Sequence, residues 1–439
     1  MEPSSRSTPR TPPVTRPVAI VGSARIPFAR SFGAYADETN RTLLAAALAA
    51  LADRFALRDE PIGEVVAGAV IKHPRDWNLA REAALDAGLA PRTPACDVQR
   101  ACATSLTAAL DVARRIARGE IDCGIAGGAD SVSDLPLTLR RRLARIVSTS
   151  ARAPTLARRL QPWLALRPGD LRPEVPGVAE PRTGLSMGEH CERMAKEWGI
   201  GRVEQDELAL ASHRRAHAAT DAGFYAGLVT SHAGLARDDN VRADGSLERL
   251  ARLPPVFDRT PAGTITAGNS SPLTDGASAV LLASDGWARA RGLPVQAWIT
   301  RSAVAAVDFA GVAGPPEGLL MAPVRAIAQV LDDARVRLAD LDVIEIHEAF
   351  AAQVLCNLAA LASPAYARER LGRAEPVGVV DRQRLNPHGS SIAVGHPFGA
   401  TGTRILGALA HDMAVRDLRR GLVSICTAGG MGVVALLER

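Results

Sequence analysis

One short pattern occurs in both halves of this chain. After residue 102, a turn of small residues opens a helix that ends near Gly119, and the strand "DCGIAGGADSV" follows. After residue 392, "AVGHPFGATG" opens the helix "TRILGALAHDMAVRDLRR", and "LVSICTAGGMGVVALLE" follows as a strand containing a Gly-Gly pair. A duplicated turn–helix–strand unit predicts an α/β protein of two related domains, in which corresponding ends of the sheets supply the functional loops.

The other segments predict the domain boundaries. "PVAIVGSARIPF" and "EVVAGAVI" are typical of strands, "TLLAAALAALADRF" is typical of a helix, and "GASAVLLAS" is expected to resume the first half. We therefore expect an N-terminal domain over 17–133 plus 256–284 and a C-terminal domain over 285–439. Residues 134–255 are richer in Arg, Pro and short helical segments, which predicts an inserted loop or lid domain. Residues 1–16, rich in Ser, Thr, Pro and Arg, are expected to be a flexible tail without a secretory signal.

Composition limits the class of protein. With 439 residues and 47% hydrophobic content, the chain can bury one or two substantial cores. No apolar run reaches the roughly 18 residues that a transmembrane helix needs, so no membrane span is expected. The six cysteines are scattered and form no Cys-x-x-Cys pair, which favours a reducing, cytoplasmic location over a disulfide framework.

The net charge of +5 comes almost entirely from arginine, and the densest basic stretch runs from Leu139 to Trp163. A solvated helical face is the simplest interpretation of this stretch. An anionic cofactor tail, a peripheral contact with a membrane or an acidic partner remain open alternatives. Nucleic acid is not expected as a partner, because aromatic residues are sparse and are not interleaved with the arginines.

Cys102, in "VQRACATSL", stands directly before the first of the two repeated helices. A single cysteine is ordinarily a small buried hydrophobic residue. At a helix N-terminus, however, unpaired N–H groups and the helix dipole favour the thiolate and are expected to lower the thiol pKa below about 8.5. Cys102 is therefore a candidate nucleophile.

The other groups that a cysteine-dependent acyl transfer needs also have candidates. His396 lies between Gly and Pro in the corresponding turn of the second half, and Cys426 ends a strand before the Gly-Gly pair. His347 and Glu348 end an apolar strand and open a helix, where a polar pair favours a functional site over a core position. A nucleophile, a base, a proton donor and donors to the thioester oxygen are together the requirements of this chemistry.

Two other classes of site fit poorly. The glycines between 395 and 402 lack the G-x-G-x-x-G spacing of a dinucleotide-binding loop, and no His/Cys spacing suits zinc, so no metal is expected.

Five stretches in order make the chain resemble a thiolase (acetyl-CoA C-acyltransferase) from about residue 17 to residue 439: "VQRACATSL", "GTITAGNSSPLTDGASAVLLAS", "EIHEAFAAQ", "NPHGSSIAVGHPFGATG" and "CTAGGMG". "GLSMGEHCERM" and the HEAF form resemble the branch that includes the β-subunit of fatty-acid oxidation complexes. The resemblance implies duplicated α/β/α domains in five layers (αβαβα) with an inserted loop domain. It also implies thiolytic cleavage of 3-ketoacyl-CoA to acetyl-CoA and a shortened acyl-CoA in β-oxidation.

The resemblance also implies roles for matching residues. Cys102 would be acylated and His396 would take its proton, while Cys426 would be the acid and base at the α-carbon. His347 and His396 would form one oxyanion hole, and the backbone N–H groups of Cys102 and Ala428 would form the other. Coenzyme A would be a substrate, with no cofactor required.

Ser271, Met187 and Phe350 would contact substrate or coenzyme A. Ser186 stands where many short-chain thiolases have histidine.

Alternative functions remain open at this point. A biosynthetic acetoacetyl-CoA thiolase would share the same residues, although those enzymes usually carry NEAF in place of HEAF. A decarboxylating ketoacyl synthase does not need the second thiol of Cys426, and an inactive thiolase-like scaffold does not need the four catalytic candidates. The resemblance implies a homodimer or homotetramer, and a hydratase/dehydrogenase subunit is a candidate partner.

Overall fold

The computed structural model describes residues 16–177 and 179–439. Its strands form two halves with the same spatial order. In chain order, the first half contributes β1 (Val18–Arg25), β3 (Val65–Ala67), β5 (Cys123–Asp130) and β6 (Thr274–Ser284), and the second half contributes β7 (Ala297–Ala306), β8 (Val343–Ile346), β9 (Arg420–Thr427) and β10 (Met431–Glu438). These strands lie in the order β3-β5-β6-β1 and β8-β9-β10-β7, so the predicted duplication is confirmed.

The pairing directions also repeat. The first two strands of each spatial order run parallel, and the remaining neighbours run antiparallel. Strands β1 and β7 join the halves through a short antiparallel ladder between residues 18–20 and 297–299. At the outer edge of the first half β4 (Ala95–Asp97) pairs with β3, and β2 (Ala29–Arg30) pairs with the start of β6.

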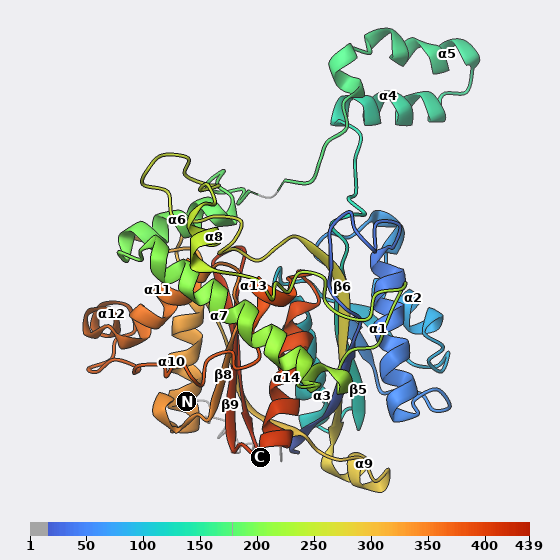
Figure 1. Cartoon of the computed structure of the whole chain (residues 1–439). Coiled ribbons are helices and arrows are strands. Elements are labelled where there is room, and N and C mark those ends of the chain that lie inside the picture. The colour runs from blue at the N-terminus through green and yellow to red at the C-terminus, as the bar shows by residue number, and fades with distance from the viewer. Residues whose placement is uncertain (1–15, 178) are drawn as a thin grey trace, which may run out of the picture.

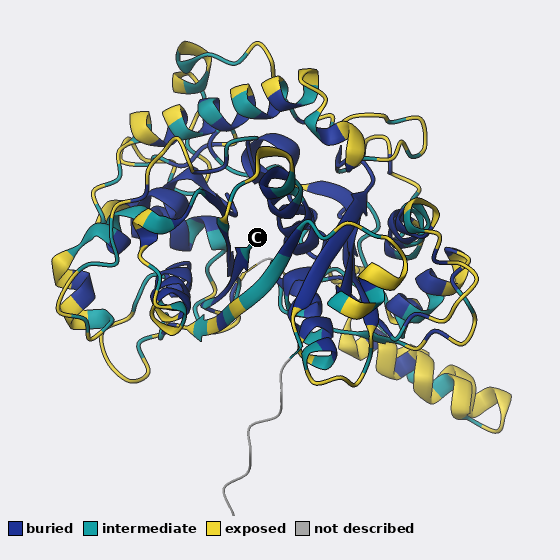
Figure 2. Cartoon of the chain, turned by 90° about the horizontal axis from the view of Figure 1, so that it is seen from below, coloured by how far each residue is buried: buried dark blue, intermediate teal, exposed yellow. Residues whose placement is uncertain are grey.

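Helices divide the protein into five layers (Figure 1). The central layer is α3 (Thr104–Ala117) with α14 (Thr401–Arg416); the outer layers are α1 (Asn40–Phe55) with α2 (Leu79–Asp86), and α10 (Ala322–Ala334) with α11 (Ala351–Ala362). Alternation along β9 and β10 shows the layering. Val423 and Val433 face the central helices, whereas Leu422 and Val434 face the outer layer. Figure 2 shows the strands and central helices as the buried part of the molecule.

Small residues bring the two central helices close together. A Cβ on Gly402 would lie 2.2 Å from the backbone nitrogen of Leu106, so only glycine permits this approach. The backbone N–H of Thr403 also donates to the hydroxyl of Ser105, at 3.0 Å. The turns that precede the repeated helices are therefore neighbours in space.

The segment predicted as a loop or lid domain has two structural parts. The first part, a helical hairpin over residues 139–173, contains α4 (Arg141–Arg152), α5 (Leu156–Leu160), η2 (Gln161–Ala165) and η3 (Pro168–Leu171), and it extends away from the body (Figure 1). In the second part, α6 (Met187–Glu197) and α7 (Arg202–Asp221) pack on α11, and α7 also packs on α13 (Ser391–Val394). Only the second part lies against the second half of the fold.

The remaining elements are short: η1 (Pro74–Asp76), η4 (Phe224–Gly227), α8 (Leu247–Ala251), α9 (Asp285–Ala290), η5 (Leu338–Asp340) and α12 (Pro364–Arg370). Within the described ranges, no helix combines the length and apolar character needed to cross a membrane.

Two details differ from the sequence-based expectations. The stretch predicted as one strand after α14 is a hairpin, because Gly429 (φ 77°) and Gly430 (φ 69°) adopt left-handed conformations that turn the chain between β9 and β10. Residues 1–15 of the expected tail lie outside the described residues. Arg16 is already anchored to the body, since its guanidinium donates to the carboxylate of Asp122 at 2.7 Å and to the carbonyl of Ile121.

Candidate active site

Cys102 lies on a strained turn before α3. Ala101 has a φ of 41°, a left-handed conformation that costs a non-glycine residue on the order of 1–3 kcal/mol. The side chain of Thr104 stabilises the turn: its hydroxyl donates to the carbonyl of Ala101 at 2.7 Å and accepts from the N–H of Arg100 at 2.9 Å. Cys102 keeps partial exposure, as a residue that receives a substrate requires.

Two buried imidazoles approach this thiol. His347 lies in the connection between β8 and α11, and His396 lies between α13 and α14. The sulfur of Cys102 and one ring nitrogen of each histidine lie within 4.8 Å of one another, and the two ring centroids are 4.1 Å apart. Among the described residues, neither Nε2 has a hydrogen-bond partner, which leaves both atoms free for a bound group.

The hairpin between β9 and β10 completes the cluster. The backbone N–H groups of Ala428 and of Cys102 itself approach the Cys102 sulfur. The φ of Ala428 is negative, so alanine is accommodated there without strain. Cys426 is buried at the end of β9, near enough to Cys102 that each thiolate would disfavour the other.

The site holds neutral groups. Burial raises the pKa of Cys102 to about 12, despite the two backbone N–H groups. The predicted lowering of this pKa is wrong, because Cys102 precedes the first residue of α3 by two positions and the cost of dehydrating a thiolate exceeds the stabilisation from nearby N–H groups. Burial, together with the charge of Arg404, lowers the pKa of His396 to about 3, and burial lowers the pKa of His347 well below its ordinary value. The thiol must therefore give its proton to a neighbouring base before it attacks.

The predicted substrate contacts lie on neighbouring segments. The N–H of Ser271 donates to the carbonyl of Ala349 at 2.9 Å, which places Ser271 beside Phe350. Met187 begins α6 and packs on the core of the second half, whereas the Ser186 side chain caps that helix. The assignment of Ser271, Met187 and Phe350 to coenzyme A stays a prediction.

The hydrogen bonds of Glu348 hold neighbouring segments together. Its buried carboxylate accepts from Ser212 and from Asn386, at 2.7 Å in each case. The first bond links α7, and the second links the loop before α13, to the connection between β8 and α11. The structure therefore places His347 near Cys102, while Glu348 fixes the segment that carries it. The functional role of His347 stays a prediction.

Sequence reasoning missed several buried polar residues that arrange the site. Asp130 accepts from the backbone N–H groups of Val70, Ile71 and Gly399, which ties the end of β5 to the turn before α14. Glu180 accepts from the N–H of Gly429. Ser391, Thr401 and Arg404 support the two imidazoles, and their closeness in sequence to His396 was the only available signal.

A thiol with two imidazoles is also a donor set that zinc could use. The presence of a second buried thiol and converging backbone N–H groups instead fits a cysteine-dependent acyltransferase, in which a base activates the nucleophile and N–H groups receive an oxyanion.

Comparison with known proteins agrees with this class. A family model described as the thiolase N-terminal domain matches residues 18–286, and one described as the thiolase C-terminal domain matches residues 300–439. The chain belongs to the thiolase family. It is 41% identical to a 3-ketoacyl-CoA thiolase of Yersinia pestis (strain Pestoides F) over 427 residues, which is 96% of each chain.

Solved structures match along almost the whole length. A crystal structure of the Bacillus anthracis acetyl-CoA acetyltransferase is 30% identical and superimposes with a TM-score of 0.80, covering 97% of this chain and 99% of the other. A crystal structure of human mitochondrial 3-ketoacyl-CoA thiolase in complex with CoA is 27% identical, with a TM-score of 0.79 and coverage of 97% and 98%. These similarities confirm the fold expected from the sequence.

Proposed function

We propose that this protein catalyses the CoA-dependent thiolytic cleavage of 3-ketoacyl-CoA to acetyl-CoA and a shortened acyl-CoA, as a step of fatty-acid β-oxidation. The observation that carries the proposal is the approach of the Cys102 sulfur to one ring nitrogen of each of two buried imidazoles, beside a second thiol. The printed names of the relatives in Yersinia and in human mitochondria support the substrate class.

In the first half-reaction, His396 accepts the Cys102 proton and the sulfur attacks the 3-keto carbon. The bond between the α-carbon and that carbon breaks, Cys102 keeps the acyl group, and Cys426 gives its proton to the α-carbon of the departing acetyl-CoA. In the second half-reaction, the thiol of coenzyme A gives its proton to the Cys426 thiolate and takes the acyl group. The Cys102 sulfur leaves the acyl carbon and regains its proton from His396. Both thiols are thereby restored, so no net proton is lost.

Oxyanions form in both half-reactions. One oxygen would lie against the imidazoles of His347 and His396, and the other would lie against the backbone N–H groups of Cys102 and Ala428. Both sets of donors are held by buried segments, so they need little reorganisation when negative charge develops.

The direction of the reaction needs a kinetic test. The HEAF motif and the 41% identity to a 3-ketoacyl-CoA thiolase favour degradation, while biosynthetic acetoacetyl-CoA formation is the alternative. We expect kcat/KM for thiolysis to exceed that for acetyl-CoA condensation and to rise when substrates longer than acetoacetyl-CoA are supplied. The degradative assignment would be contradicted if acetyl-CoA condensation were faster than the thiolysis of every 3-ketoacyl-CoA tested.

We further propose that coenzyme A acts as a substrate without a cofactor or metal, and that the protein is a cytoplasmic homodimer or homotetramer. The Arg-rich hairpin, 139–173, has two candidate partners. One is a hydratase/dehydrogenase subunit, and the other is the surface of an anionic membrane. The hairpin favours such a role because it exposes Leu139, Leu156 and Leu164 beside its arginines.

A further inference from the structure

The two active-site imidazoles have different hydroxyl partners at their outer nitrogens. Nδ1 of His347 lies 2.7 Å from the Ser391 hydroxyl oxygen, and Nδ1 of His396 lies 2.6 Å from the Thr401 hydroxyl oxygen. All four side chains are buried. A neutral imidazole carries one N–H, so the hydrogen bond at Nδ1 determines whether Nε2 enters the site as a donor or as an acceptor.

The Thr401 hydroxyl favours one tautomer of His396. It donates its hydrogen to the backbone carbonyl of Pro397 at 3.0 Å. The Thr401 oxygen is then an acceptor for the N–H at Nδ1 of His396. This arrangement leaves a lone pair on Nε2, which is the form of His396 that can accept the Cys102 proton.

The Ser391 hydroxyl favours the opposite tautomer of His347. Arg404 donates from Nη2 to the Ser391 oxygen at 2.6 Å, and a guanidinium has no acceptor to offer in return. Within residues 16–177 and 179–439, the Ser391 hydroxyl meets no other acceptor than Nδ1 of His347. A fully buried hydroxyl whose hydrogen finds no acceptor would cost folding free energy. The Ser391 hydroxyl therefore donates its hydrogen to Nδ1 of His347, and the N–H of that imidazole lies at Nε2.

We propose that Ser391 and Arg404 are positioning residues that hold His347 in its Nε2–H tautomer, while Thr401 holds His396 in the Nδ1–H tautomer. The two rings therefore differ in role before substrate arrives: His347 is a hydrogen-bond donor and His396 is a base. When His396 takes the Cys102 proton, its own Nε2 becomes a donor and joins His347 at the substrate oxygen. This inference rests on the proposed function and names the residues that set the protonation of the two histidines before substrate binds.

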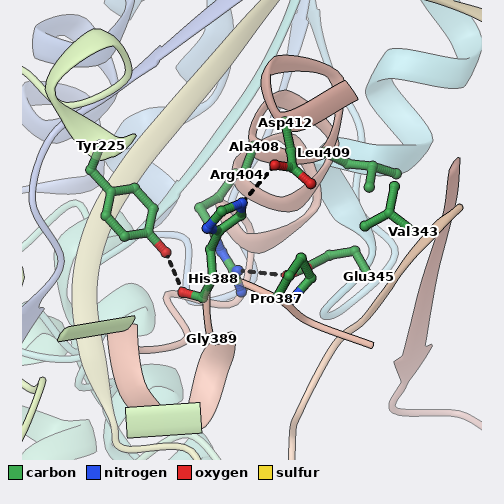
Figure 3. A pocket seen from close by; sticks show the side chains of 10 residues that line it. All are labelled: Tyr225, Val343, Glu345, Pro387, His388, Gly389, Arg404, Ala408, Leu409 and Asp412. Atoms are coloured by element: carbon green, nitrogen blue, oxygen red, sulfur yellow. Dashed lines mark hydrogen bonds and ion pairs between the residues drawn. The ribbon is translucent and has the colours of Figure 1, made fainter. Parts of the chain in front are cut away.

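The surroundings of Arg404 suit this task. Its side chain is 2% exposed, and its Nη1 lies 3.3 Å from both Glu345 Oε1 and the Ser390 oxygen. Figure 3 shows Arg404 on α14 beside Glu345, with His388 and Asp412 lining the same small cavity. The fixed positive charge also lowers the pKa of both histidines, which keeps them in the neutral form for which a tautomer is defined.

Kinetics of three variants test the positioning role. Loss of one oxyanion donor typically lowers kcat by about 10²–10³-fold, and Ser391→Ala leaves the imidazole present but free to take either tautomer. We therefore expect a fall in kcat for thiolysis of about 10–100-fold with little change in KM. Ser391→Thr keeps the hydroxyl and should restore most of the rate. The matched control is Ser390→Ala, which removes a neighbouring buried hydroxyl that touches Arg404 and Glu345 but no imidazole.

The tautomers are directly measurable by ¹⁵N NMR on protein labelled at its nine histidines, with His347→Asn and His396→Asn used for assignment. We expect a protonated Nε2 at His347 and a protonated Nδ1 at His396, with the His347 signal changing in Ser391→Ala and returning in Ser391→Thr. A protonated Nδ1 at His347 in the unmodified protein would overturn the inference, and so would unchanged kcat in Ser391→Ala. If the unmodified protein showed no thiolysis, the proposed function would fail while the tautomer measurement kept its meaning.

Discussion

At the scale of single residues, proton position dominates the chemistry of this site. Burial keeps the Cys102 thiol and the two imidazoles neutral in the free protein, so the nucleophile forms only when a proton is transferred. A dehydrated site of this kind strengthens each hydrogen bond made to a developing oxyanion.

Cys102→Ala tests the nucleophile. Because Cys102 is the proposed carrier of the acyl unit, we expect the variant to lose both thiolysis and condensation. It should also lose the acyl adduct that mass spectrometry detects after incubation with acyl-CoA. Iodoacetamide should modify Cys102 before Cys123, Cys191 or Cys356, which are buried. An adduct at another cysteine would refute the assignment.

Cys426→Ala separates the two half-reactions. The variant should still become acylated at Cys102, because the base that activates Cys102 is His396 and not Cys426. It should not exchange the α-protons of acetyl-CoA with deuterated solvent, an exchange that ¹H NMR follows. Exchange at the unmodified rate would assign the acid and base to another residue.

The loss of folding stability at low pH should reveal the buried imidazole of His396. The folded-state pKa of His396 is about 3 against an ordinary 6.5, so the unfolded chain binds a proton that the folded chain does not between these values. This contribution to stability is complete above pH 6.5 and is lost as the pH falls towards 3.

His396→Asn should therefore lose less free energy of unfolding between pH 7 and pH 4 than the unmodified protein, as measured by urea denaturation. The control is the same substitution at His217, whose side chain is 43% exposed. Equal pH dependence in the His396 variant and the unmodified protein would contradict the neutral-imidazole description.

At the scale of elements, the sequence predicts best what short-range patterns encode. The turns at Cys102 and His396 were recognisable because a nucleophile or base among small residues precedes an amphipathic helix. The β9–β10 turn was not resolved, since a Gly-Gly pair within a continuous apolar run is compatible with either a strand or a hairpin. The contact from Arg404 through Ser391 to His347 joins α14, α13 and the connection after β8, and only tertiary packing brings these segments together.

The Arg-rich hairpin, 139–173, yields a prediction at this scale. Arg142 supports the hairpin itself, since it donates to the carbonyl of Ala165 at 2.6 Å. Arg140, Arg141 and Arg145 are exposed and available for an outside partner. Their replacement by glutamine should weaken binding to vesicles containing anionic lipid, in a salt-dependent manner, and leave kcat/KM for acetoacetyl-CoA unchanged.

A control variant with Arg252, Arg289 and Arg368 replaced by glutamine removes the same charge from other exposed positions. An equal loss of vesicle binding in both variants would indicate a non-specific charge effect. A rise in KM for every CoA substrate, seen only in the hairpin variant, would instead assign these arginines to the nucleotide end of coenzyme A.

At the scale of the whole molecule, the duplicated halves form one catalytic unit. Cys102 comes from the first half, whereas His347, His396 and Cys426 come from the second, so neither half contains a complete site. The turn–helix–strand unit repeats in the sequence, so two similar halves were predictable, and their strand orders agree with that prediction. No sequence pattern indicated that β1 and β7 would pair and join the halves.

The proposed homodimer or homotetramer has a candidate contact at β4, whose outer side pairs with no strand within residues 16–177 and 179–439. We expect light scattering to give at least twice the mass of one chain. A monomer at micromolar concentration would contradict this expectation and leave the catalytic proposal intact.

The stem of the hairpin has a practical consequence for engineering. Thr138 and Glu174 exchange both of their backbone hydrogen bonds, at 3.1 Å and 2.8 Å, so the chain enters and leaves the hairpin at one point. A short turn could close this gap with little change in loop entropy, because closure cost varies only logarithmically with length. The hairpin can thus be treated as a removable module: excision, transplantation into a relative or replacement by another binding element would change the proposed docking surface without rebuilding the chemistry beneath it.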